Sequence, residues 1–179
     1  MRYQTIRTHL RPYSILARRR TTVNHAFASA IAPCDVFEDQ RVREAIRLLE
    51  LDPDAELNCA YCGNPAETWD HIFATVRKSQ FSDYGHRLGN LLPCCKPCNS
   101  RKGNKSWEDY LESLPLPQAT RERRFECIPR FLAKYSVLDP TDPQDRDLGE
   151  LESLRTEILR LMAEADRIAT RIRSRRAPT

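Results

Sequence analysis

The sequence contains no uninterrupted apolar run of about 18 residues, the length that a membrane-spanning helix requires. The first 20 residues also lack an apolar stretch of the kind found in signal peptides. Internal repeats and low-complexity tracts are absent as well. These absences predict a globular protein of the cytoplasm that neither crosses a membrane nor is exported.

Acidic residues are missing from the beginning of the chain. From Met1 to Cys34 there is no Asp or Glu, but there are six arginines: Arg2, Arg7, Arg11, Arg18, Arg19 and Arg20. From Arg77 to Lys105 seven basic residues accompany one acid, Asp83. The formal net charge is +4. Such stretches favour a polyanionic partner, although two solvated basic faces would have the same composition. Residues 1–20 are interpreted as a basic arm, and Arg18–Arg20 could enter a nucleic-acid groove.

Four of the seven cysteines form two C-x-x-C pairs, Cys59/Cys62 and Cys95/Cys98. In a reducing compartment, cysteines serve as metal ligands or free thiols rather than as disulfides. The short turn within each pair can direct both thiolates at one tetrahedral ion. Four thiolates favour zinc or an iron–sulfur centre, and a closed structural zinc site fits a small, loop-rich region better.

The other three cysteines are expected to take no part in metal binding. Cys94 does not stand at the C-x-x-C distance from Cys98, and Cys34 and Cys127 are expected to be buried thiols. Thirty-two residues separate Cys62 from Cys95. A zinc ribbon usually has about 15–20 residues there. The longer segment predicts a structural insert whose ends the metal draws together, in the order strand, loop, strand, followed by a helix.

The remaining periodicity is helical, so the predicted class is α-rich α+β. Three segments are expected: a basic arm with helices (1–57), a zinc-bound core (58–114) and C-terminal helices (115–179). Predicted helices cover residues 22–31, 38–51, 106–114, 119–135 and 148–174. Ser106 is the expected N-cap of its helix.

The last predicted helix carries a heptad pattern. One seam position holds Leu151, Ile158, Ala165 and Ile172, and the other holds Leu154, Leu161 and Ile168. Three heptads are the minimum for a coiled coil. The pattern favours a homodimer, and docking onto helices of the same chain would need a similar stripe.

The insert contains Asp70-His71, then Asn90-Leu91-Leu92-Pro93, and Asn99 directly follows the last cysteine. This ordered combination, from Cys59 to Lys105, resembles the HNH, or ββα-metal, endonucleases. The resemblance implies a zinc-bound ββα-metal core flanked by helices. The family often has His where this chain has Asn99, and Asn occurs there in branches that also carry four zinc cysteines.

By resemblance, His71 is the general base, Asp70 and Asn99 ligate a catalytic Mg²⁺ with Mn²⁺ as an alternative, and Asn90 fixes the hairpin and the His71 ring. Neutral imidazole suits a base near pH 7, and oxygen ligands suit Mg²⁺. Each of the four residues also has a structural alternative: a satisfied histidine, a surface acid, a turn residue or a helix N-cap. His86 could contact phosphate or the metal.

The function implied by the resemblance is hydrolysis of DNA phosphodiester bonds, in restriction or phage defence, with junction resolution as an alternative and a partner protein of a defence system as a further expectation. A zinc-dependent DNA-binding module without catalysis is the alternative of another class. Five basic residues ring the proposed site, and some of them are expected to contact phosphate while the rest form a solvated face: Lys78, Arg87, Arg101, Lys102 and Lys105.

Overall fold

The computed structural model describes residues 2–176 and combines many helices with a small amount of sheet. The chain divides into two compact units. The terminal unit consists of Met1–Phe27 and Asp142–Thr179, and the central unit consists of Ala28–Thr141. The three segments expected from the sequence cut across these units, because the two ends of the chain belong to one unit.

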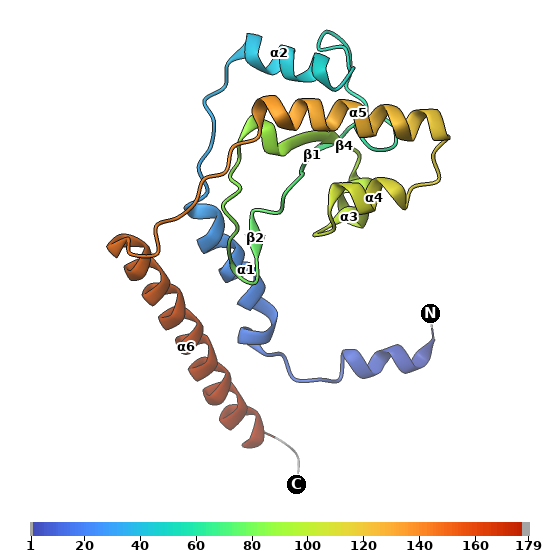
Figure 1. Cartoon of the computed structure of the whole chain (residues 1–179). Coiled ribbons are helices and arrows are strands. Elements are labelled where there is room, and N and C mark those ends of the chain that lie inside the picture. Colours follow the sequence, from blue (N-terminus) through green and yellow to red (C-terminus); the bar gives the residue numbers. More distant parts are fainter. Residues whose placement is uncertain (1, 177–179) are drawn as a thin grey trace. The chain divides into compact units, whose positions relative to one another are not determined.

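The terminal unit is built on two long helices, α1 (Ile15–Ala30) and α6 (Arg146–Ser174), preceded by a 3-10 helix, η1 (Tyr3–Thr8). The Asp166 carboxylate of α6 accepts hydrogen bonds from the first amides of α1, Ile15 N at 2.7 Å and Leu16 N at 3.0 Å. Further along, Arg155 of α6 donates to Asn24 of α1 at 2.9 Å. The two contacts fix α1 and α6 side by side and antiparallel (Figure 1).

The sequence-based boundary of α1 was wrong. A helix was expected from Thr22, with an irregular arm before it, but α1 begins at Ile15 and Arg18–Arg20 are helical. The residue that completes the N-terminal cap is Asp166, 151 residues away from Ile15 in the sequence. Local capping signals cannot show an acid that arrives through tertiary structure.

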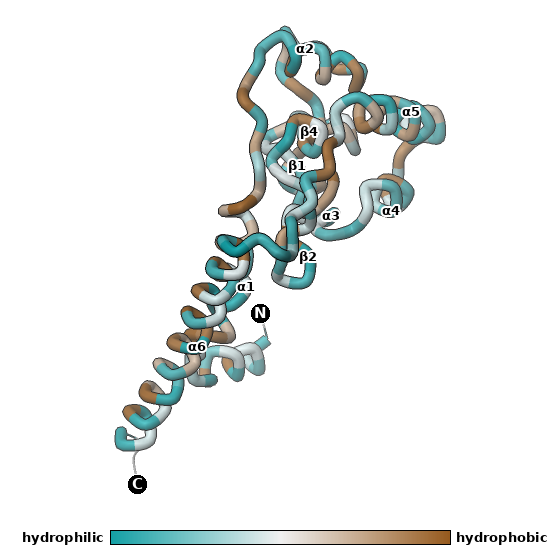
Figure 2. The backbone as a smooth tube through the Cα atoms, turned by 60° about the vertical axis from the view of Figure 1, so that its left-hand side comes forward, coloured by the Kyte–Doolittle hydropathy of each residue, from teal (hydrophilic) through white to brown (hydrophobic). Residues whose placement is uncertain are grey.

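Burial varies around α6. A half-buried stripe includes Arg155, Leu159 and Met162 together with one seam residue, Leu151. Other heptad positions remain largely exposed, with Leu154, Leu161 and Ile168 retaining 55%, 52% and 44% exposure. The recurrent apolar positions of α6 are visible along the tube in Figure 2. Packing within the terminal unit therefore leaves most of the predicted heptad seam uncovered.

The central unit contains two two-stranded sheets surrounded by helices. Its first sheet pairs β1 (Thr68–His71) with β4 (Leu91–Cys94) in antiparallel register, which places Asp70 opposite Leu92 and His71 opposite Leu91. The second sheet is a short hairpin in which β2 (Val76–Arg77) pairs with β3 (Gln80–Phe81), and it lies between β1 and β4 in the sequence. The remaining elements, in chain order, are α2 (Asp39–Leu48), η2 (Leu88–Asn90), α3 (Lys96–Lys102), α4 (Trp107–Glu112) and α5 (Gln118–Tyr135).

The core of the central unit lies where α2, α4 and α5 pack around the cysteine-bearing segments (Figure 1). Phe131 and Ile128 of α5, Leu92 of β4 and Leu111 of α4 are almost completely buried there. Gly89 of η2 lies directly against the end of α5, because a Cβ atom at this position would stand 2.0 Å from the Tyr135 carbonyl oxygen. The segment that carries Asn90 is thus packed directly against the helices of the core.

The structure confirms the mixed helical and small-sheet class. It also confirms the Ser106 cap, since this side chain accepts a hydrogen bond from Asp109 N at 3.0 Å. The expectation for Cys34 was wrong: this thiol is exposed, whereas Cys127 is buried. Cys34 lies outside a helix, in the extended segment that bridges to His86, so no apolar layer covers it. Among the described residues, no helix has the length and apolarity to cross a membrane.

Candidate metal centre and active site

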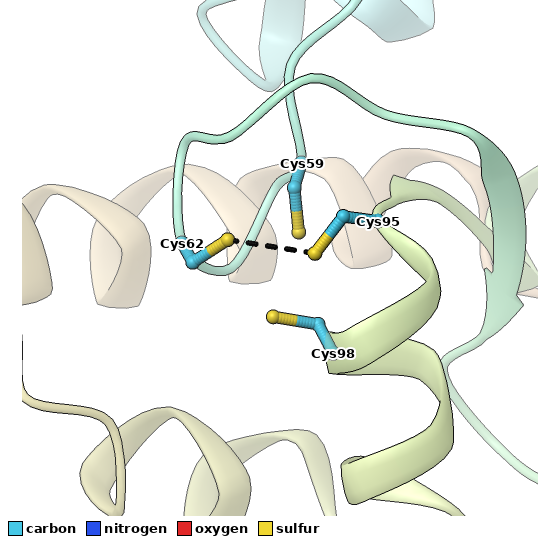
Figure 3. A group of neighbouring side chains, drawn as sticks. All are labelled: Cys59, Cys62, Cys95 and Cys98. Carbon is cyan, nitrogen blue, oxygen red and sulfur yellow. Dashed lines mark hydrogen bonds between the residues drawn. The ribbon is translucent and has the colours of Figure 1, made fainter.

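The four cysteines of the two C-x-x-C pairs meet in space (Figure 3). Their sulfur atoms all lie within 4.8 Å of one another, and Cys62 Sγ is 3.6 Å from Cys95 Sγ. A tetrahedral ion with Zn–S bonds of about 2.3 Å would hold its sulfurs about 3.8 Å apart. The spacing and the all-sulfur donor set therefore fit a structural metal ion such as zinc.

Each cysteine pair is positioned by its own backbone turn. In the first turn, Cys59 O accepts a hydrogen bond from Gly63 N at 2.9 Å, and Cys59 N donates to Asn64 O at 2.7 Å. Gly63 has a φ of 81°, a conformation that strongly favours glycine. In the second pair, Cys95 is the N-cap of α3 and Cys98 lies in the first turn of that helix. The helix dipole at this end favours ionised thiolates.

Cys94 lies beside the cluster without belonging to it. Its sulfur is 3.9 Å from Cys59 Sγ, and its thiol donates to Cys95 O at 3.4 Å. The contact between the two sulfurs lowers the pKa of Cys59 and raises that of Cys94. Cys94 therefore stays a neutral thiol next to an ionisable Cys59, in keeping with the expectation that it is not a ligand.

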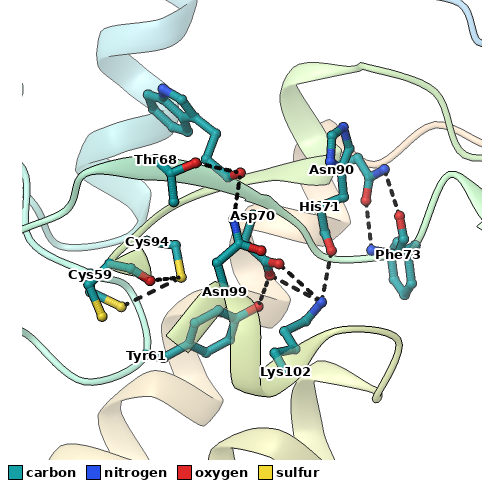
Figure 4. Close-up of polar contacts among 12 residues, drawn as sticks. Cys59, Tyr61, Thr68, Asp70, His71, Phe73, Asn90, Cys94, Asn99 and Lys102 are labelled. Carbon is teal, nitrogen blue, oxygen red and sulfur yellow. Dashed lines mark hydrogen bonds and ion pairs between the residues drawn. The ribbon is translucent and has the colours of Figure 1, made fainter. Parts of the chain in front are cut away.

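Asp70 points inward from β1 into a buried polar network (Figure 4). Its Oδ2 atom accepts a hydrogen bond from the Tyr61 hydroxyl at 2.7 Å and forms an ion pair with Lys102 Nζ at 3.1 Å. Burial raises the pKa of the Asp70 carboxyl, while Lys102 and the Tyr61 hydrogen bond oppose this effect. The sequence reasoning missed Tyr61, although it stands inside the first C-x-x-C pair, where a buried side chain is to be expected.

Lys102 is buried and is not available for the phosphate contact expected from the sequence. Only 1% of this residue is exposed, and its ammonium donates to His71 O at 2.8 Å besides pairing with Asp70. The ammonium is enclosed in the junction between α3 and β1. Lys102 thus joins the helix to the strand that carries both Asp70 and His71.

His71 ends β1 and points away from this network, as the alternation of side chains along a strand requires. Its Nε2 atom lies 2.9 Å from Nδ1 of His86, with the two rings in an edge-to-face arrangement. Burial, together with the neighbouring charges of His86 and Lys102, lowers the pKa of His71 to about 4. The His71 imidazole is therefore neutral near pH 7.

Asn90 is fully occupied in holding the insert together. Its Oδ1 atom accepts from Phe73 N at 2.8 Å, and its Nδ2 atom donates to Phe73 O and Gly85 O, both at 3.0 Å. Asn90 lies at the end of η2, directly before β4 rather than within it. Its side chain fixes the loop backbone, and the His71 ring is contacted by His86, the residue after Gly85.

Asn99 lies one turn before Lys102 on α3, at the same junction with β1. Its Nδ2 atom donates to Trp69 O at 3.4 Å (Figure 4). The Asp70 carboxylate and the Asn99 amide oxygen are ligands of the hard type that Mg²⁺ prefers. The fit is incomplete, because both Asp70 oxygens already lie within 3.4 Å of Lys102 Nζ.

The other expected phosphate-binding residues differ in their surroundings. Lys78, Arg101 and Lys105 are exposed. Arg87 is instead engaged within the central unit, where it bonds Asp139 through two nitrogens, at 2.6 and 3.0 Å, and Asp35 through a third at 3.1 Å. The acids that bind Arg87 come from distant segments of the chain, so the local sequence pattern does not reveal them.

Comparison of the chain with known protein families, with curated proteins and with solved structures found no match.

Proposed function

We propose that the chain is a metal-dependent endonuclease of the HNH type, which hydrolyses phosphodiester bonds of DNA. The observation that supports this most is a neutral, half-buried imidazole, His71, at the end of a strand whose partner strand leads into the four-cysteine cluster. A base of this kind is useful only if it is ready to accept a proton and is held rigidly. The cysteine cluster supplies the rigidity.

In this proposal, His71 accepts the proton of the attacking water through Nδ1. Its Nε2 atom then carries the other proton and donates it in the hydrogen bond to Nδ1 of His86. That bond holds the ring and its tautomer, as orienting groups do in other catalytic histidines. A Mg²⁺ ion bound by Asp70 and Asn99 would neutralise charge on the leaving oxygen. Asp70 would have to share its carboxylate between that ion and Lys102.

The direct test is incubation of supercoiled plasmid with the protein in Mg²⁺, in Mn²⁺ and in EDTA. We expect cleavage with the metals only. His71→Ala should retain zinc and helical structure but cut at least about 100-fold more slowly, the usual contribution of a general base. Cutting by this variant at the wild-type rate would show that the mechanism is wrong. Discrete bands would support a restriction or junction-resolving enzyme, and a smear would support a non-specific defence nuclease.

A second candidate is a zinc-dependent DNA-binding module without catalysis. The buried ion pair between Asp70 and Lys102 favours it, because a carboxylate that is already neutralised has less need of a metal ion. This candidate expects tight binding of DNA with no cleavage in any divalent cation. The plasmid experiment therefore separates the two candidates directly.

The exposed heptad seam of α6 supports a homodimer as the working form. Its apolar residues follow the alternating three- and four-residue spacing of a coiled coil, so the matching partner is a helix of the same period, which a second copy supplies. Leu161→Asp should convert a dimer to a monomer in light scattering, whereas Thr156→Asp, at an exposed position off the seam, should not. A wild-type monomer both free and on DNA would contradict this part of the proposal.

A further inference from the structure

Both ends of the chain are rich in arginine and free of acid. No acid precedes Asp35, and none follows Asp166, although five arginines do: Arg167, Arg171, Arg173, Arg175 and Arg176. Every lysine of the sequence lies between Lys78 and Lys134, so the basic residues of the terminal unit are all arginines. Arginine binds phosphate through two parallel hydrogen bonds, which lysine cannot do.

The fold brings these two stretches together. Because Asp166 binds the amides of Ile15 and Leu16, the first turns of α1 lie beside the second half of α6. In this antiparallel register, Arg18–Arg20 lie about one turn inward from the Asp166 contact, and the last arginines of α6 lie one to three turns of 5.4 Å outward from it. We call the exposed arginines on the two sides of this contact the terminal arginine cluster: Arg18, Arg19, Arg20, Arg171, Arg173, Arg175 and Arg176.

The charge of this cluster is not neutralised by ion pairs within the described part of the chain. Two acids of the neighbouring α6 segment are already engaged, since Asp166 caps α1 and Glu164 pairs with Arg167 at 3.0 Å. No ion pair within residues 2–176 involves a member of the cluster. Other arginines of the protein do have acidic partners, as Arg130 has in Glu50 at 2.8 Å. Mutual repulsion in the cluster would be relieved by an external polyanion.

We propose that the terminal arginine cluster, which belongs to the terminal unit, binds the phosphate backbone of DNA. This inference rests on the proposed nuclease function for the identity of the polyanion. Contacts to phosphate carry no sequence information, so the cluster adds affinity and orientation rather than base specificity. Each neutralised phosphate releases counterions, which makes the binding strongly dependent on salt.

The test measures binding rather than cleavage. Full-length His71→Ala protein, which should not cut the probe, is titrated against a fluorescent DNA duplex at several NaCl concentrations. Arg171→Gln/Arg173→Gln in that background should reduce the slope of log K against log salt by nearly 2, at about 0.9 for each phosphate contact, and weaken binding at least tenfold near 0.1 M salt. Arg123→Gln/Arg130→Gln is the matched control, since it removes the same charge from residues paired with Glu50.

Two results would overturn the inference. One is an equal loss of slope in the cluster variant and the control, because net charge alone would then explain the effect. The other is unchanged DNA binding by the cluster variant. If that variant instead loses binding to phosphatidylserine vesicles, the cluster is a membrane-binding surface, since an arginine-bearing helix with an apolar stripe also suits a membrane. A protein that binds DNA through the cluster but never cuts plasmid would refute the nuclease proposal alone.

Discussion

Lys102 Nζ lies 3.1 Å from Oδ2 of Asp70, and the two side chains are 1% and 4% exposed. Burial removes water from both charges, so each depends on the other for compensation. The same ammonium donates to His71 O, and the same carboxylate accepts from Tyr61. One ion pair therefore connects α3, β1 and the first cysteine turn, and its loss should destabilise all three segments.

Lys102→Met should destabilise the protein by about 3 kcal/mol or more, because it leaves the Asp70 carboxylate buried without a counter-charge. Asp70→Asn/Lys102→Met should recover much of that loss, since neither partner is then charged. Lys105→Met, at an exposed position three residues away, is the control and should change stability by less than about 0.5 kcal/mol. Urea unfolding at saturating zinc measures all three. A double variant less stable than the single one would argue against a compensating pair.

Cys98→Ser should abolish stoichiometric zinc binding and unfold much of the central unit, because a metal site of this type contributes its binding free energy to folding. Cys94→Ala and Cys34→Ser should both retain one zinc per chain, since neither sulfur belongs to the four-cysteine cluster. Elemental analysis and circular dichroism of the purified variants give the two readouts. Zinc loss in Cys94→Ala would mean that Cys94, and not Cys95, completes the site.

The sequence predicted the metal cluster well because its signal is local. Two cysteines separated by two residues can reach one ion whatever lies between the pairs, so the assignment needed no knowledge of the fold. The order of two strands followed by a helix was predicted from the composition and short periodicity of the insert, but the segment expected to be a loop also contains the β2–β3 hairpin. Ser106 was predictable for a similar reason, since a capping side chain and its amide lie within one turn.

The errors concern residues whose surroundings come from distant parts of the chain. Lys102 was assigned to phosphate because it stands in a basic run, but the partner that buries it is Asp70, 32 residues earlier. Arg87 was misjudged similarly, because Asp35 and Asp139 reach it from either side of the insert. A charge run shows how many basic residues are present, and only tertiary structure shows which of them are already paired.

The low pKa of His71 predicts that the protein loses stability as the pH falls. An imidazole whose pKa is lowered from 6.5 to about 4 by burial binds its proton more readily in the unfolded chain. The resulting stabilisation is complete above about pH 6.5 and is lost as the pH falls toward 4. Between pH 7.5 and pH 5 the loss should be about 2 kcal/mol.

Acid also releases the metal from the cysteine cluster, which destabilises the protein independently of His71. Comparison of the wild type with His71→Gln separates the two effects. The difference in unfolding free energy between wild type and His71→Gln should shrink by about 2 kcal/mol from pH 7.5 to pH 5, since the variant has no proton to bind at this position. The zinc contribution is common to both proteins and cancels. A difference that stays constant with pH would mean that His71 is as easily protonated in the folded protein as in the unfolded chain.

Gly89→Ala and Gly149→Ala make the same chemical change in opposite surroundings. At Gly89 the new Cβ would stand 2.0 Å from Tyr135 O and 2.1 Å from Tyr135 C, both backbone atoms of α5 that cannot rotate away. The end of α5 or η2 must then shift, at a cost of at least about 2 kcal/mol. At Gly149, within α6, nothing lies within 4 Å, and alanine should stabilise the helix by about 0.5–1 kcal/mol. The melting temperatures of the two variants, followed by circular dichroism, should therefore move in opposite directions.

The two variants should also differ in plasmid cleavage. Because Gly89 directly precedes Asn90, Gly89→Ala should lower the cleavage rate by loosening the loop that carries His86, whereas Gly149→Ala should cut plasmid at the wild-type rate. Equal melting temperatures for the two variants would show that η2 does not lie as close to α5 as the backbone contact requires.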